Sequence, residues 1–173
     1  MSDVKLGLGR ASGMFYHAPA GTALPTDPTA ELASAWVHVG DISDTGITFT
    51  PNKSTENIKN WALEVKRVVQ TDHSETIQAP IMDTTEEVFK TIVGEDNVTT
   101  ASGVTTVNMS AGSLPPEEAF LFLMNDGEHT MGIGCSYGQI SAIEAVSFSP
   151  TAAINWTVTI TATSGSDMKI IKK

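Results

Sequence analysis

Residues 154–163 alternate strictly between apolar and polar side chains, and this pattern constrains the fold more than any other feature of the sequence. Ile154, Trp156, Val158 and Ile160 share one parity, whereas an asparagine and three threonines occupy positions 155, 157, 159 and 161. Successive side chains of a β-strand point to opposite faces, so this segment has one apolar and one polar face. The pattern predicts a half-buried strand.

The composition extends this expectation to the whole chain. Of the 173 residues, 22 are threonine and 15 are serine, and only 17% are charged. A β-branched residue such as threonine suits the pleated surface of a strand better than it suits a helix. The length is that of one domain, and a hydrophobic content of 40% excludes a disordered chain.

Further apolar or alternating segments predict the other strands. The polar residues 71–75, 125–128 and 136–138 indicate tight turns, and the aperiodic residues 51–60 indicate an exposed loop. We expect strands near residues 14–17, 36–39, 47–50, 61–70, 76–82, 98–100, 104–109, 118–124, 129–135, 140–148 and 154–163.

One helix interrupts the strands at about residues 84–93. Asp83 and Glu86 have the spacing of a capping box, in which each side chain accepts a hydrogen bond from the other residue's amide. Gly94 is suited to end the helix. The apolar stripe of this helix consists of Val88, Phe89, Ile92 and Val93.

These elements predict a mainly β fold, a β-sandwich or partly closed barrel of about nine strands with one flanking helix. Residues 1–34, rich in Gly, Ala and Pro, form an N-terminal arm with a short strand. Residues 35–163 form the β-sandwich, and residues 164–173 a C-terminal tail. Residues 120–124 are apolar at both parities, so we expect cover on both faces of this strand, from the core and from the helix or a neighbouring subunit.

The formal charge of −10 and the pI near 4.6 argue against a protein that binds nucleic acid by neutralising phosphates. A single cysteine, Cys135, excludes an internal disulfide. The first residues lack the basic and apolar regions of a secretory leader, and no apolar run reaches the length of a membrane span. The cytoplasm is therefore the expected site of synthesis.

No pattern in the sequence indicates catalysis, a cofactor or a metal. Cys135 lies in an apolar strand pattern typical of a small buried residue, and the four histidines lack metal-ligand spacing. Adjacent carboxylates such as Glu86 and Glu87 do not face each other across a cleft. The glycines at residues 7–13 lack the Lys-Ser/Thr element of a phosphate-binding loop. We expect no catalytic, cofactor-binding or metal-binding residues, and no enzyme.

Residues 36–98 resemble the major tail tube proteins of long-tailed bacteriophages, especially those of actinobacterial hosts. An ordered series of features carries the resemblance. It consists of the glycine-bounded stretch 36–47, the polar loop 51–60 closing on Trp61, a hairpin at 64–75, and the helix at 84–94 followed by Glu95-Asp96-Asn97-Val98.

The resemblance implies a structural virion protein whose hexameric rings stack into a hollow tube around a tape measure protein. Genome DNA then passes through the lumen without specific binding. Further implied partners are a tail terminator and a distal tail protein, and the implied location is the virion tail after assembly in the host cytoplasm. The arm 1–34 and the tail 164–173 would contact neighbouring subunits.

By the same resemblance the loop 41–60 would be the ring-stacking element, and strands of the hairpin at 61–82 and of later hairpins would help to line the lumen. The stacking residues would be Asp41, Ser43, Asp44, Asn52, Lys53, Glu56 and Lys59. Asp72 and Glu75 would face the lumen, where acidic charge repels DNA. The alternative hypothesis is a monomeric β-sandwich module for virion decoration or receptor binding, and a carbohydrate-processing enzyme is a weaker third.

Overall fold

The computed structural model describes residues 7–9, 14–109, 112, 114–127, 129–163 and 165–173, and within these ranges the chain is mainly β with one α-helix. The helical elements are α1 (Glu86–Val93) and the short 3-10 helix η1 (Glu95–Asn97). The strands are β1 (Phe15–Pro19), β2 (Val37–Gly40), β3 (Thr48–Lys59), β4 (Val65–Ile81), β5 (Val98–Ala101), β6 (Val104–Val107), β7 (Glu118–Asp126), β8 (His129–Ile143), β9 (Trp156–Ala162) and β10 (Lys169–Lys172).

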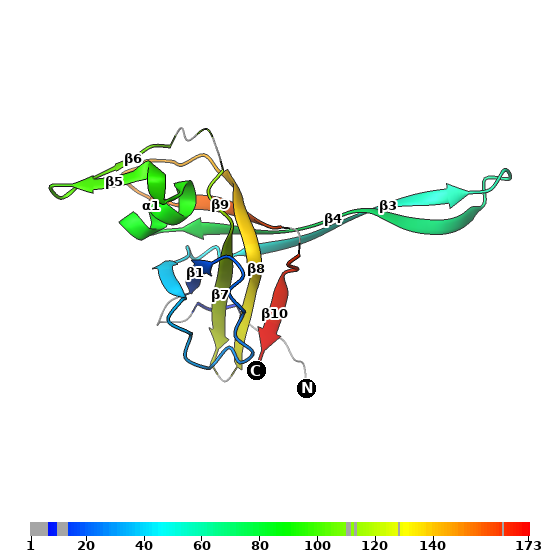
Figure 1. Cartoon of the computed structure of the whole chain (residues 1–173), viewed down its shortest axis with the longest axis horizontal. Coiled ribbons are helices and arrows are strands. Elements are labelled where there is room, and N and C mark those ends of the chain that lie inside the picture. Colours follow the sequence, from blue (N-terminus) through cyan, green and yellow to red (C-terminus); the bar gives the residue numbers. More distant parts are fainter. Residues whose placement is uncertain (1–6, 10–13, 110–111, 113, 128, 164) are drawn as a thin grey trace.

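Eight of these strands form one antiparallel sheet in the order β2-β1-β7-β8-β9-β4-β3, with β10 paired to β8. Strand β8 pairs with β7 over 129–138, while its other partners are β10 at 131–134 and β9 at 138–143. Strands β5 and β6 form a separate hairpin beside α1 (Figure 1). The sheet stays open and does not close into a barrel.

The hairpin of β3 and β4 projects far beyond the rest of the molecule (Figure 1). Its turn lies at residues 60–64, where the Asn60 amide donates to the Glu64 carbonyl. The predictions of an exposed loop at 51–60 and of a tight turn at 71–75 are therefore wrong. Both segments are strand, and they pair with each other from Pro51 opposite Glu75 onward.

Both faces of β3 are exposed to solvent, and this explains the two wrong predictions. Residues 51–59 are all exposed, so β3 has no apolar face and no alternation to reveal it. Pro51 lacks an amide donor, but β3 is an edge strand of the sheet, where proline is tolerated.

The turn predicted at residues 136–138 is also wrong, because β8 runs through it without interruption. Gly138 occupies a position where the neighbouring side chains leave no room for a Cβ atom. A Cβ at this position would lie 2.7 Å from Cys135 Sγ and 3.0 Å from the Phe120 ring. The predicted tail 164–173 likewise contains a strand, β10, whose Ile170 pairs with Ile133.

The main core lies between one face of the sheet and α1. Phe15 and Phe122 stack with ring centroids 4.5 Å apart, and the apolar stripe of α1 packs against them through Val88, Ile92 and Val93. The alternation seen in the sequence is confirmed, since Ile77, Ala79 and Ile81 in β4 and Trp156, Val158 and Ile160 in β9 are all buried.

The helix is confirmed, but its cap differs from the prediction. Thr85 is the N-cap, and its Oγ1 accepts a hydrogen bond from the Val88 amide at 3.4 Å. Asp83 instead accepts the Asp41 amide at 2.7 Å, which ties the helix entrance to the end of β2. Gly94 ends the helix at a positive φ of 87°, with its amide donating to the Lys90 carbonyl.

Strand β7 is covered on both faces, as its composition predicts. Phe120 and Phe122 point into the main core. Leu121 and Leu123 point the other way into a second cluster, where Leu24 and Leu32 from the predicted arm and Trp36, just after it, cover them. The second cover is therefore the chain's own N-terminal region, and no neighbour is needed for it.

Truncation of Ile160, which is fully buried in β9, tests the assigned core. Ile160→Ala should lower the free energy of unfolding by about 2–5 kcal/mol, because it removes apolar burial and leaves a cavity. Denaturant unfolding at concentrations where the protein is monomeric measures this. Ile170→Ala, at a 61% exposed position, is the matched control and should change the free energy of unfolding by less than about 0.5 kcal/mol. Equal effects would contradict the assignment.

Candidate functional site

The projecting hairpin is the most unusual surface of the molecule. Its turn carries Trp61 and Leu63, which are 103% and 76% exposed. Ile58, Val65 and Val68 on the flanking strands are also exposed. Large apolar side chains gathered at a protruding tip are typical of an interaction site.

The turn that presents these side chains is well ordered by hydrogen bonds. The Asn60 amide group donates to the Glu64 carboxylate at 2.8 Å, and the Glu64 backbone amide donates to Asn60 Oδ1 at 2.9 Å. Leu63 adopts a positive φ of 61°, an uncommon conformation for a non-glycine residue. The turn therefore holds Trp61 and Leu63 outward in a defined arrangement.

The hairpin also differs from the rest of the chain in charge. Residues 53–70 contain four basic and two acidic side chains, a formal charge of +2. The remaining residues together carry −12, which gives the chain its net charge of −10. The basic residues are Lys53, Lys59, Lys66 and Arg67, all exposed. The outer part of the hairpin, residues 53–70, is thus basic, whereas β3, the turn and β4 together carry four basic and four acidic side chains.

The structure separates the predicted stacking residues into two groups. Asn52, Lys53, Glu56 and Lys59 lie exposed along β3. The others, Asp41, Ser43 and Asp44, lie in the connection between β2 and β3 at the base of the hairpin, where Ser43 is buried and the two aspartates are exposed.

Asp72 and Glu75, the predicted lumen residues, both lie on β4 but in different environments. Asp72 is exposed. The Glu75 side chain is only 14% exposed, and its Oε2 accepts the Met168 amide at 2.6 Å. Glu75 therefore anchors the segment that leads into β10, a role that its position in the sequence does not reveal.

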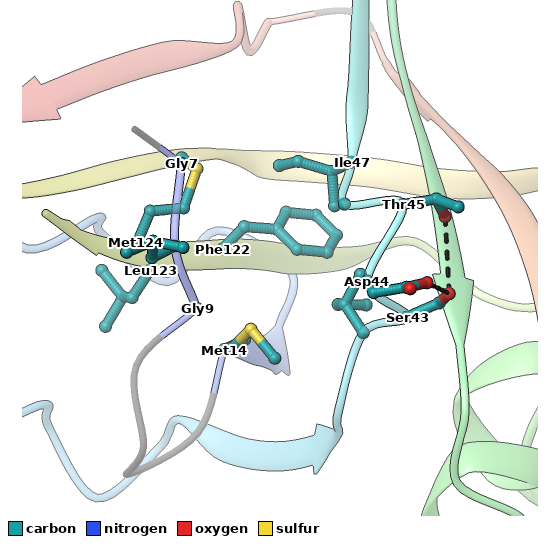
Figure 2. Close-up of a pocket in the computed structure, with 13 residues that line it drawn as sticks. Gly7, Gly9, Met14, Ser43, Asp44, Thr45, Ile47, Phe122, Leu123 and Met124 are labelled. Carbon is teal, nitrogen blue, oxygen red and sulfur yellow. Dashed lines mark hydrogen bonds between the residues drawn. The ribbon is translucent and has the colours of Figure 1, made fainter. Parts of the chain in front are cut away.

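An apolar pocket of about 460 Å³ opens at the base of the hairpin (Figure 2). Phe122, Leu123 and Met124 of β7 form one wall, Met14 another, and the connection from Ile42 to Ile47 a third. Asp44 lies at this wall and accepts a hydrogen bond from Ser43 Oγ. No pattern in the sequence indicated this pocket, since its walls come from three distant segments.

Among the described residues, one group has ligand atoms close enough together to hold a metal ion. His73, Glu75 and Asp167 place one such atom each within 4.8 Å of the others. His73 and Asp167 are exposed, and one Glu75 oxygen already accepts the Met168 amide. These contacts account for the group as a link between β4 and the C-terminal segment, and we assign no metal to it.

Cys135 is fully buried in β8, as the strand pattern predicts. Burial raises the pKa of its thiol to about 11, so the thiolate needed for nucleophilic chemistry is scarce at neutral pH. Glu86 forms an ion pair with Lys90 at 2.8 Å and accepts the Thr100 hydroxyl. These contacts are structural and bring no nucleophile to a base.

His17 joins three elements of the body. Its Nδ1 lies 2.9 Å from Glu118 Oε2 on β7, and its Nε2 lies 2.9 Å from Glu87 Oε1 on α1. Burial opposes protonation of the ring, but the hydrogen bonds and charges of Glu118 and Glu87 outweigh it and raise the pKa of His17 above 6.5. Only the protonated ring can donate to both carboxylates at once.

A family model described as "Phage tail tube protein" matches residues 9–172. Among solved structures, a chain from "Tail of empty GTA particle computed with helical refinement, C6 symmetry" is similar with a TM-score of 0.42 and 8% sequence identity, over 92% of this chain and 98% of that chain. No curated protein matches the sequence. In the described ranges, no helix has the length and apolar character that crossing a membrane requires.

Titration of His17 should make stability depend on pH. The pKa of His17 is higher in the folded protein than in the unfolded chain, where it is about 6.5. The contribution of the protonated ring to the free energy of unfolding is therefore complete below about pH 6.5 and is lost as the pH rises through the folded pKa. Unfolding free energies measured from about pH 6 to pH 9 should therefore fall more steeply for the wild type than for His17→Gln. His38→Gln, at an exposed position, is the control. An unchanged slope in His17→Gln would contradict this assignment.

Proposed function

This chain belongs to the phage tail tube protein family, and on that premise we propose that its copies assemble through the β3–β4 hairpin into stacked rings that form a hollow tube. The resemblance found in residues 36–98 thus extends over almost the whole chain. The protein is a structural component of the virion tail. Hexameric rings are the form that the family resemblance implies.

The projecting hairpin is the observation that carries the proposal. A two-stranded ribbon alone is marginally stable in water, and this one exposes an edge strand and, at and near its tip, large apolar side chains. Contacts with other copies would cover both. Because the tip and the body of one copy are different surfaces, such contacts are head-to-tail and continue from copy to copy.

Asn52, Lys53, Glu56 and Lys59 on β3 are the proposed stacking contacts along the arm. Asp41, Ser43 and Asp44 are proposed to act at its base, as part of the surface that receives another copy. Neighbouring subunits would also contact the arm 1–34 and the tail 164–173. Assembly in the host cytoplasm, with a tape measure protein inside and a terminator and distal tail protein at the ends, completes the proposal.

Genome DNA would pass through the lumen without specific binding. Six copies carry a formal charge of about −60. Acidic groups on the inner wall would repel the DNA backbone and limit adhesion during passage. Asp72 is the better candidate for this role, since Glu75 is half-buried and already accepts the Met168 amide.

Removal of the hairpin tests assembly. Residues 53–73 are replaced by Asn-Gly, a two-residue turn suited to a hairpin, which then joins the paired residues Asn52 and Ser74. The variant should remain folded, because the core lies outside the deleted stretch, and it should form no tubes. Electron microscopy over a concentration series measures assembly, and circular dichroism checks the fold.

The same microscopy separates the two functions considered. Tubes or stacked rings from the wild type, with none from the folded deletion variant, support the hairpin as the assembly element. A wild type that stays monomeric even with tape measure and distal tail proteins present would favour a monomeric decoration or receptor-binding module.

Charge reversal at Asp72 tests the acidic lumen. Virions with Asp72→Lys should assemble normally and deliver their genome more slowly, because the added positive charges attract DNA. Asp96→Lys, an equal change at an exposed position in η1, is the control. Unchanged delivery by a virion whose tube structure places residue 72 in the lumen would overturn the proposal.

A further inference from the structure

We propose that Trp61 and Leu63 at the hairpin tip of one copy insert into the apolar pocket at the hairpin base of a second copy. The inference rests on the proposed assembly and names the contact that drives it. Four observations carry it: the character of the pocket, the character of the tip, the distance between them and their charges.

The pocket has the size and lining to receive an aromatic side chain. Its volume of about 460 Å³ falls in the range of roughly 300–1,000 Å³ typical of small-ligand sites. Figure 2 shows Phe122, Met124 and Ile47 around the space, with Met14 on its other side. Side chains of this kind favour an apolar occupant.

The tip presents a matching occupant. Trp61 and Leu63 are the two most exposed large hydrophobic residues among those described. They sit on a turn fixed by the Asn60–Glu64 hydrogen bonds, so little conformational freedom is lost on binding. Tryptophan is also the residue type most often found as a central anchor of protein interfaces.

The tip cannot reach the pocket of its own chain. Ile47 in the pocket wall directly precedes Thr48, the first residue of β3. Strand β3 then runs for 12 residues, which at about 3.3 Å per residue places the tip roughly 40 Å away. The occupant supplied by this sequence must therefore come from another copy.

Charge favours the same pairing. Lys59, Lys66 and Arg67 flank the tip, and all three are exposed. Asp44 lines the pocket, and exposed Asp41 lies three residues before it. The basic outer part of the hairpin is thus attracted to the acidic body of a neighbour, an attraction that salt weakens.

An intermolecular disulfide tests the contact directly. The double variant Leu63→Cys with Thr45→Cys places one thiol at the tip and one at the pocket, where Thr45 is a lining residue. Mild oxidation of assembled protein should give a ladder of covalent multimers that a reductant reverses. The natural Cys135 is buried and does not interfere.

Two controls define what the ladder means. Leu63→Cys alone should give no species beyond a dimer. Leu63→Cys paired with Thr105→Cys, at an exposed position on β6, should give no ladder either. A ladder from this second pair, or none from the first, would overturn the proposed contact.

Truncation of the anchor gives an independent measurement. Trp61→Ala should raise the critical concentration for assembly at least about tenfold, the effect expected for an interface anchor, while Trp61→Phe should raise it less. The fold should be unaffected because Trp61 makes no buried contact. Phe148→Ala, which truncates another exposed aromatic residue, is the matched control and should leave assembly unchanged.

Failure of the inference differs from failure of the proposed function. Normal tubes from Trp61→Ala, together with no ladder from the cysteine pair, would overturn the tip-in-pocket contact and leave tube assembly standing. A wild type that never polymerises would overturn both.

Discussion

The structure depends on one continuous strand, β4, which belongs to the core and to the projecting arm at once. Its inner residues, Thr76–Ile81, pair with β9 on one edge and, from Thr76 to Gln78, with β3 on the other. Its outer residues pair with β3 alone. A slip of one residue would turn Ile77, Ala79 and Ile81 out of the core, so the core fixes the register of the whole arm.

The point where β4 leaves the body is secured from the C-terminal side. Glu75 accepts the Met168 amide, which places the Met168 side chain in the main core and directs β10 onto β8. On the other side, Asp83 accepts the Asp41 amide and joins the end of β2 to the entrance of α1. The inner segment of β4, residues 76–81, is therefore flanked on both sides by contacts with the body, and the arm extends from this anchored base.

Sequence patterns predicted the parts of the fold that bury a face. The alternation in β9 and at residues 77–81, the stripe of α1 and the double apolar character of β7 all reflect contacts with the core, and all are confirmed. The hairpin was missed because β3 is solvated on both faces. The break predicted at Gly138 was wrong because close packing against Phe120 and Cys135 requires that glycine. The pocket joins three segments, ending at Met14, at Ile47 and at Met124, and nothing local encodes it.

If the arm binds other copies, the absence of an apolar face on β3 limits the contacts that this strand can make. An exposed edge strand invites indiscriminate pairing, and charged side chains and proline suppress it. Pro51 and Lys53 lie on this edge strand, and Ile58 is the large apolar residue among its exposed residues 51–59. The two most exposed large apolar side chains among the described residues, Trp61 and Leu63, lie in the turn. Apolar contacts with another copy are therefore made mainly by the end of the arm, which favours one partner surface. The strands themselves do not promote aggregation before assembly.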